Sequence, residues 1–297
     1  MSSFKTTTFG KSIFSGEHTV LRGGPALVFP LFTKKLELEY TASSAPLSVT
    51  ASGENASDIV ELFPGVLAKA LELLNRKNNK LTGTVVFRNE LPLGSGIGTS
   101  SSLCVAFSRW LHYLGLVAES DIYEFARQLE NIFHGESSGV DIAVVLHAKP
   151  LIFKRPNIIE TLSVRNTFNL YLSHTGQKGI TKDCVTKVNE LIKADPEKGK
   201  RVDDKMIQVT LDAIKLFSNP NTIKDSSELA PILNQGYECF KEWGLTEGAV
   251  DKHINFLKEH GALAVKPTGS GGGGYVLSLW PDNVKPKFDF ELIALFE

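Results

Sequence analysis

Residues 91–102 have the composition of a loop that binds an anion. Three glycines alternate with other residues there, and four hydroxyl side chains follow before an apolar helical pattern begins. A glycine backbone can approach a ligand closely, and the amides and positive dipole end of a helix N-terminus attract negative charge. No Gly-Lys-Ser/Thr closes the run as in a P-loop, and the spacing is not that of the dinucleotide-binding fingerprint. Taken alone, the run predicts either a polyphosphate site or a structural turn.

The four hydroxyl residues at 99–102 could act in two ways. One of them is expected to cap the helix, because a hydroxyl at this position accepts a bond from an unpaired backbone amide. Four in succession exceed what capping requires. A hydroxyl here could also coordinate Mg²⁺ on a bound nucleotide, since Mg²⁺ prefers oxygen ligands and keeps few protein contacts.

Lys11 lies between Gly10 and Gly16 in a mostly apolar segment with the pattern of a strand. An isolated lysine is normally a surface residue, yet a lysine in such a segment would reach solvent with difficulty. Glu17 and His18 follow as neighbours, so their side chains point to different sides of an extended chain. They could line a polar pocket, or Glu17 could be an ordinary surface charge, and the spacing favours neither interpretation.

Two carboxylates, Glu130 and Asp141, border apolar segments. Glu130 lies at the edge of the apolar face of an expected helix, and Asp141 follows a turn of small residues and precedes an apolar run at 142–146. A carboxylate beside a buried segment needs a partner. Lys11 is a candidate counter-ion for Asp141, which would make the pair structural. The functional alternative is that Asp141 handles the proton of a substrate hydroxyl.

A second glycine cluster occupies residues 266–275. Five of the six residues from 269 to 274 are glycine. This composition is typical of a flexible linker. However, an expected strand begins at Tyr275, and no domain-sized segment follows that a linker would join. The cluster therefore predicts close backbone packing against another loop or a ligand.

The whole chain indicates what class of protein must position these residues. Its 297 residues suffice for one large domain or two of ordinary size. The hydrophobic (42%) and charged (22%) fractions are typical of a globular protein. The net charge of −1 gives no overall field to attract nucleic acid or an anionic membrane. Three widely separated cysteines, without a signal sequence or a membrane-spanning run, predict a cytoplasmic protein.

Local patterns predict a first half that mixes strands with helices and a second half rich in helices. Strands are expected at residues 4–9, 26–31, 36–40, 47–51, 81–87, 169–173 and 275–279. Helices are expected from Pro64 to about residue 75, at 103–114 and 122–133, and later at 206–217, 229–240 and 250–257. Residues 154–157 are expected to connect two domains.

Together, these segments resemble the three motifs of the GHMP small-molecule kinase family, in the same order. The first corresponds to residues 10–18, the second to residues 92–101 and the third to residues 266–274. As in the family, Glu130 stands eleven residues before Asp141, which ends a His-Gly-x-x-Ser-Gly-Val-Asp string. The motifs span nearly the whole chain. The departures are Thr99, Ser101 and Ser102, where the family often has Ser and an Ala pair.

The resemblance implies an α+β fold of two domains with an active site in the cleft between them. Residues 1–155 would form a ribosomal-protein-S5-like α/β domain that binds ATP. Residues 156–297 would form a ferredoxin-like α+β domain. The implied activity is ATP-dependent phosphorylation of a small-molecule hydroxyl group.

Within the family, the members that phosphorylate the primary hydroxyl of mevalonate are the most similar. Galactose and phosphomevalonate are the alternative acceptors, although His18 stands where the phosphomevalonate branch usually has Tyr. A catalytically inactive metabolite sensor is a further alternative. It would be expected to have lost Lys11, Glu130 or Asp141, and all three are present.

The resemblance also implies roles for individual residues. Asp141 would orient or deprotonate the acceptor hydroxyl, and Lys11 would lie between Asp141 and the γ-phosphate. Mg²⁺, the expected cofactor of ATP, would be held by Ser100 and Glu130. The nucleotide would be bound by Pro92, Gly94, Ser95, Gly96, Ile97, Gly98, Thr99, Ser100 and Ser101.

Glu17, His18 and Thr268 are the residues that the resemblance implies on the substrate side. His18 is a candidate donor to a substrate carboxylate. The expected partners are ATP, a small-molecule acceptor and a second copy of the chain in a homodimer, without nucleic acid or membrane.

Overall fold

A computed structural model describes residues 3–76, 80–134, 137–156, 158–219, 221 and 225–296 of the chain. Of the segments singled out in the sequence, Gly135, Glu136 and Asn157 lie outside these described residues. None of the helices in the described part has the length and apolar character needed to traverse a lipid bilayer.

The chain forms two compact units that do not follow chain order. The division expected from the resemblance, residues 1–155 and 156–297, stays a prediction. Unit 1 contains Met1–Gly10, Phe32–Leu93 and Gly98–Ala148, and unit 2 contains Lys11–Leu31, Gly94–Ile97 and Lys149–Glu297.

Unit 1 is built on strands that pair through β2. β2 pairs antiparallel with β4, with Leu38 opposite Phe87, and β4 pairs parallel with β3. β1 also pairs with β2. The segments expected as separate strands at 26–31 and 36–40 form one strand, because the residues between them stay extended. The strands are β1 (Ser3–Ser15), β2 (Ala26–Pro46), β3 (Ser48–Gly53) and β4 (Thr82–Asn89).

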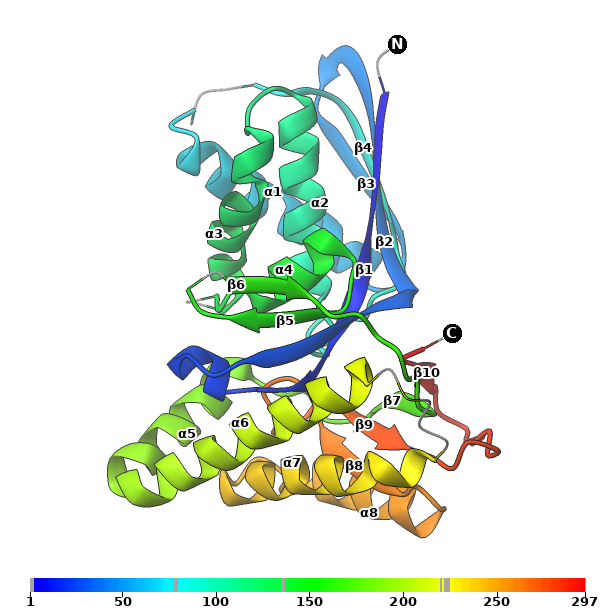
Figure 1. Cartoon of the computed structure of the whole chain (residues 1–297). Helices are drawn as coiled ribbons and strands as arrows, with labels where there is room; N and C mark the ends of the chain where they lie inside the picture. Colours follow the sequence, from blue (N-terminus) through cyan, green and yellow to red (C-terminus); the bar gives the residue numbers. More distant parts are fainter. Residues whose placement is uncertain are drawn as a thin grey trace. The chain divides into compact units, whose positions relative to one another are not determined.

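The helices of unit 1 lie on one side of these strands (Figure 1). Phe63, Phe107 and Trp110 form mutual ring contacts, and Phe63 also reaches Phe87 on β4. The helices expected at 103–114 and 122–133 are confirmed as α2 and α3. The bounds are α1 (Ala56–Leu73), α2 (Thr99–Tyr113), η2 (Glu119–Asp121), α3 (Ile122–His134) and α4 (Val140–His147).

Two expectations about helix starts are wrong. Pro64 does not begin a helix but lies inside α1, which starts at Ala56. A proline there lacks the N–H that would bond to the carbonyl four residues earlier, so burial of the apolar face holds this turn in place of that bond. The N-cap position of α2 is occupied by Gly98, at a φ of 89°, and not by one of the hydroxyl residues.

Unit 2 contains two groups of strands. In the first, the beginning of β2 pairs antiparallel with β5, which pairs antiparallel with β6; Phe153 of β5 lies opposite Ala26 and Ile159. The second is a four-stranded antiparallel sheet in the order β10-β7-β9-β8. The strands are β5 (Leu151–Lys154), β6 (Ile158–Thr161), β7 (Leu170–His174), β8 (Ala264–Pro267), β9 (Tyr275–Leu279) and β10 (Ile293–Ala294).

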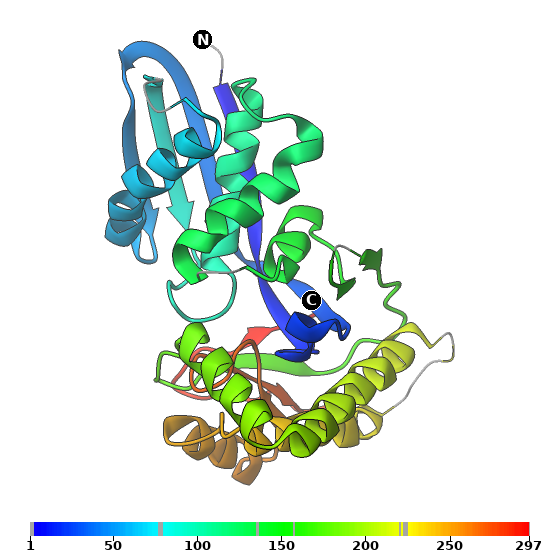
Figure 2. The same ribbon diagram turned by 90° about the vertical axis from the view of Figure 1, so that its left-hand side faces the viewer.

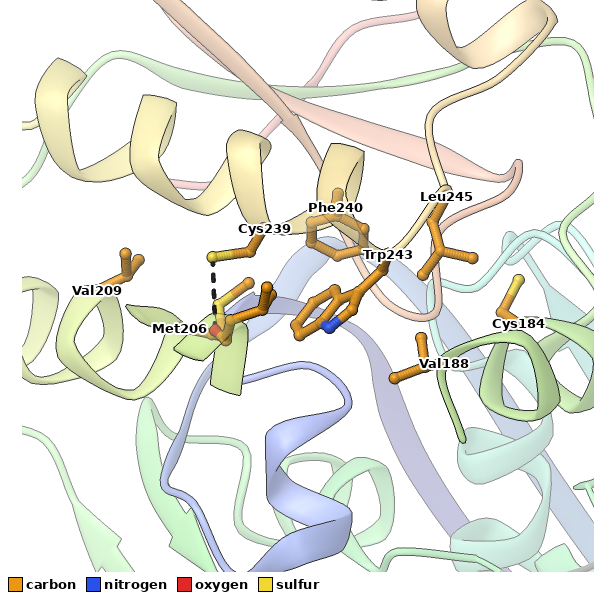
Figure 3. Packing of buried hydrophobic residues seen from close by; sticks show 9 residues of the cluster. Cys184, Val188, Met206, Val209, Cys239, Phe240, Trp243 and Leu245 are labelled. Carbon is orange, nitrogen blue, oxygen red and sulfur yellow. Dashed lines mark hydrogen bonds between the residues drawn. The ribbon is translucent and has the colours of Figure 1, made fainter. Parts of the chain in front are cut away.

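The helices of unit 2 gather on one side of the four-stranded sheet (Figure 2). α7 and α8 pack on β8 and β9 through a buried cluster around Val265, Val276 and Trp280. A second cluster, centred on Phe240 and Trp243, joins α5, α6 and α7 (Figure 3). The bounds are η1 (Thr19–Arg22), α5 (Thr181–Ala194), α6 (Pro196–Ser218), η3 (Ser226–Glu228), α7 (Ala230–Glu242) and α8 (Ala249–Glu259).

Candidate functional site

Unit 2 brings together three segments that are far apart in the sequence. The Lys11 amide, on β1, donates to the Ile97 carbonyl in the first glycine loop, at 2.8 Å. The Thr268 hydroxyl, in the second glycine cluster, donates to the Ile13 carbonyl at 2.7 Å. Because this uses the Thr268 proton, the 3.3 Å contact of Thr268 with Ser12 has Ser12 as donor. The three motif segments therefore share one neighbourhood within this unit.

The two glycine loops of unit 2 approach each other at backbone distance. A Cβ built on Gly274 would lie 2.7 Å from the Ser95 carbonyl oxygen, closer than any side chain tolerates. Gly274 also has a φ of 74°, a conformation that favours glycine. The close packing predicted for the second cluster, against another loop, is confirmed at this position.

Lys11 is buried, with 3% of its surface exposed, on the inner part of β1. It is therefore not the ordinary surface lysine that an isolated residue of this type suggests. Its backbone amide fixes it to the glycine loop through the bond to the Ile97 carbonyl.

Glu17 forms an ion pair with Lys266, a residue to which the sequence analysis assigned no role. The Lys266 ammonium lies 2.7 Å from Glu17 Oε1, and both side chains are at most 1% exposed. Burial raises the pKa of Glu17 above its ordinary value, and the attraction of Lys266 opposes that rise. Neither side chain lies on the surface, which was one of the two interpretations open for Glu17.

His18 is a buried, neutral imidazole. Its Nε2 lies 2.9 Å from the Ser270 carbonyl oxygen, which only accepts, so Nε2 carries the proton and Nδ1 does not. Nδ1 has no hydrogen-bond partner among the described residues. The ring lies 5.1 Å from that of Trp243. Burial lowers the pKa of His18 to about 4, so this side chain supplies no cation for a substrate carboxylate near neutral pH.

Replacing His18 by Asn is expected to remove a specific acid sensitivity of the fold. The unfolded His18 gains its proton near pH 6.5 and the folded one only near 4, so stability is lost as the pH falls through this window. Between pH 7 and pH 5 the wild-type free energy of unfolding should fall by about 2 kcal/mol more than that of the variant. Asn suits the positive φ of 56° at this position. Urea unfolding at both pH values measures the difference, and equal pH slopes would contradict it.

Unit 1 holds the remaining predicted residues around the start of α2. Glu130, on α3, is 2% exposed. Its Oε1 accepts a hydrogen bond from the Ser101 hydroxyl and its Oε2 one from the Ser137 hydroxyl. The Thr99 hydroxyl donates to the Pro92 carbonyl at 2.7 Å, which closes the loop before the helix. Asp141 lies in the first turn of α4, a helix that packs on α2 and α3.

Ser101, which donates to Glu130, is the residue after Ser100, the hydroxyl expected to share a magnesium ion with Glu130. Ser100 lies in the first turn of α2 and is half-buried. Ser101 stands where the family often has alanine, so the family pattern gave no signal for this contact. Ser137 was also not singled out, although it lies in the string that ends at Asp141.

Removing the Ser101 hydroxyl is expected to destabilise the fold through Glu130. In Ser101→Ala, a buried carboxylate oxygen loses its donor, which costs about 2 kcal/mol for a bond to a charged group. The matched control is Ser108→Ala on the same helix, because the Ser108 hydroxyl donates only to the Cys104 carbonyl. Urea unfolding should show the smaller loss for Ser108→Ala. Equal losses in the two variants would argue against a charged Glu130 at this contact.

The oxygen atoms of Glu130 and of its two serine partners are of the chemical type that binds a magnesium ion. They are carboxylate and hydroxyl oxygens, the ligands that Mg²⁺ prefers. No group of three or more His, Cys, Asp or Glu side chains assembles in the described ranges. An ion carried mainly by nucleotide phosphates and water needs few protein ligands.

Comparisons with known proteins find similarity to GHMP kinases. A model described as "GHMP kinases N terminal domain" matches residues 65–149. The mevalonate kinase of Aeropyrum pernix is 26% identical over 294 residues, covering 92% of this chain and 87% of that protein. The mevalonate kinase of Archaeoglobus fulgidus is 27% identical over 283 residues, covering 95% and 93%.

Solved structures of similar proteins share the fold. The L. major mevalonate kinase in complex with R-mevalonate aligns with a TM-score of 0.78 and 22% identity, over 94% of this chain and 87% of that one. The Lactococcus lactis galactokinase complexed with galactose aligns with a TM-score of 0.72 and 16% identity, over 94% and 86%. These likenesses confirm the expected α+β kinase fold and do not by themselves select the acceptor.

Proposed function

We propose that this chain is a member of the GHMP kinase family and transfers the γ-phosphoryl group of ATP to the primary hydroxyl of mevalonate. The observation that carries the proposal is the meeting of residues 11–18, 94–97 and 266–274 in one neighbourhood of unit 2. Curated relatives that align over nearly the whole chain are mevalonate kinases, which supports mevalonate as the acceptor.

We propose that the first glycine loop binds the phosphates of ATP. Gly94, Gly96 and Gly98 have positive φ values, and Gly98 is the N-cap residue of α2. Backbone amides in such a loop, and at the start of a helix, can point at an anion without obstruction by side chains. The full proposed set remains residues 92 and 94–101.

Ser100 and Glu130 are the proposed protein ligands of Mg²⁺. When bound, the ion would neutralise charge on the phosphates during transfer. Ser101 and Ser137 would keep the Glu130 carboxylate oriented through the hydrogen bonds described above. A carboxylate whose orientation is fixed before the metal binds loses less conformational entropy on binding it.

Asp141 and Lys11 are the proposed catalytic residues. Asp141 would accept or orient the proton of the acceptor hydroxyl. Lys11 would stabilise negative charge on the attacking oxygen and the transferred group. Phosphoryl transfer depends mainly on positioning and charge neutralisation, so these parts suffice for the chemistry.

Glu17, His18 and Thr268 are proposed to shape the acceptor side. The neutral His18 offers a lone pair at Nδ1 and no cation. We therefore propose that Nδ1 of His18 accepts a hydrogen bond from a hydroxyl of the acceptor. Another group would then bind the acceptor's carboxylate. A homodimer in the cytoplasm, without nucleic-acid or membrane partners, is proposed from the resemblance, and the near-neutral net charge supports the absence of those two partners.

ADP release with a panel of acceptors tests the proposed function. ATP and Mg²⁺ are supplied with mevalonate, phosphomevalonate, galactose or homoserine, and a reaction without acceptor gives the background. Mevalonate is expected to give the highest kcat/KM. A higher kcat/KM for galactose would make galactose the acceptor in place of mevalonate. Binding of a metabolite without ADP release in the presence of any acceptor would favour a sensor.

A further inference from the structure

The Lys266–Glu17 pair is buried more deeply than an ordinary ion pair. The Lys266 ammonium donates to Glu17 Oε1 and to the Pro267 carbonyl, both at 2.7 Å, and stands 5.2 Å from the centroid of the Phe240 ring. Glu17 Oε2 is buried and has no hydrogen-bond partner in the described part of the chain. A buried pair of this kind contributes little net stability, since desolvation offsets the attraction.

A helix leaves room for the Lys266 side chain. Gly236 lies inside α7, and a Cβ there would stand 3.2 Å from both Cδ and Cε of Lys266. Glycine inside a helix costs stability relative to alanine. Gly236 therefore lowers the stability of α7 but leaves the space that the aliphatic part of Lys266 fills.

The pair joins two segments whose neighbours face the acceptor side. Glu17 lies between Gly16 and His18, whose φ values of 93° and 56° make a turn with an unusual backbone. A Cβ on Gly16 would lie 2.1 Å from the Pro25 carbonyl oxygen, so this turn has little freedom to shift. Lys266 is the second-last residue of β8, two residues before Thr268.

We propose that Lys266 and Glu17 are positioning residues for the acceptor side, an inference that rests on the proposed function. Their ion pair fixes the turn that carries His18 against the segment that carries Thr268. Both partners lie within unit 2 and act through these neighbours, without contact to the transferred phosphoryl group. Glu17 is accordingly a support of the substrate side and not a ligand of the substrate.

A double-variant cycle tests this role with Lys266→Met, Glu17→Gln and the two combined. Each single change leaves one buried charge without its partner, which displaces the turn. A small displacement is expected to raise the acceptor KM about tenfold or more, while the KM for ATP changes less than about twofold. The double variant, with both charges removed, should recover part of the loss instead of multiplying it. Independent effects, or equal rises in both KM values, would overturn the proposal.

Two further variants keep the test decisive if a single variant folds poorly. Gly236→Ala retains both charges and presses on the Lys266 stem, so the acceptor KM should rise while the midpoint of thermal unfolding does not fall. Arg201→Met removes an exposed ion pair to Glu242 in the same unit and should change neither KM. An unchanged acceptor KM in Gly236→Ala, or a rise in Arg201→Met as well, would also overturn the proposal.

The failure of the inference and that of the proposed function are distinguishable. The cycle is run with whichever acceptor the wild-type protein phosphorylates, so a different acceptor refutes the proposed function alone. ADP binding, measured by calorimetry on each variant, confirms that the compared proteins are folded. A variant that binds ADP normally and keeps its acceptor KM overturns the positioning role alone.

Discussion

Asp141→Asn is expected to lower kcat by about 10²–10⁴-fold while ATP binding survives. The amide keeps the size and place of the side chain in the first turn of α4, but it cannot accept the hydroxyl proton as a carboxylate does. The glycines proposed to bind the phosphates and the contacts of Ser101 and Ser137 with Glu130 do not involve the changed group. Steady-state turnover with the preferred acceptor, together with calorimetric titration of ADP, separates the two effects.

Asp121→Asn is the matched control for this prediction. Asp121 is an exposed carboxylate at the end of η2, directly before α3 in unit 1, and its loss should leave kcat unchanged. Near-normal turnover by Asp141→Asn would remove Asp141 from the proposed role. Loss of ADP binding would instead mean that the substitution acts through the fold of α4.

Lys11→Met is expected to lower kcat by about 10²–10³-fold, the usual cost of removing a group that stabilises developing charge. Methionine keeps an unbranched apolar stem in a buried strand position and removes only the charge. The bond from residue 11 to the Ile97 carbonyl comes from the backbone and persists in the variant. The glycine loop should therefore stay in place, and the KM for ATP should change far less than kcat.

Lys5→Met provides the control on the same strand. Lys5 is exposed and pairs with Glu37 at 3.4 Å, a surface interaction that is worth little. Its removal should leave both kinetic constants unchanged. If Lys11→Met retains wild-type kcat, the ammonium has no part in transfer and the burial of Lys11 serves packing alone.

Elements with a strong periodic pattern could be predicted from the sequence. β9 matches its expected bounds of 275–279, and α2 and α3 follow the apolar stripes at 103–114 and 122–133. The predicted start of α1 at Pro64 was wrong. Proline is common in the first turn of a helix, whereas here tertiary packing tolerates it inside the helix. α5 was not predicted, since only Cys184 and Val188 are buried along it.

The site was predictable where one residue type implies one chemistry. The pattern around Lys11 and the carboxylates Glu130 and Asp141 drew attention before any contact was known. The partners were not predictable, because a local pattern does not show which distant residues meet. Lys266 reaches Glu17 across 249 positions, and Ser101 reaches Glu130 across 29. The neutral state of His18 likewise depends on burial and on the Ser270 carbonyl, which the sequence alone does not reveal.

Identification of the product formed from mevalonate tests the central claim most directly. The protein is incubated with ATP, Mg²⁺ and mevalonate, and the products are examined by ³¹P and ¹H nuclear magnetic resonance. The account predicts one ADP per mevalonate consumed and a phosphate coupled to the protons of the primary carbinol carbon. Unchanged mevalonate, or ATP hydrolysed to inorganic phosphate without a phosphorylated acceptor, would contradict it.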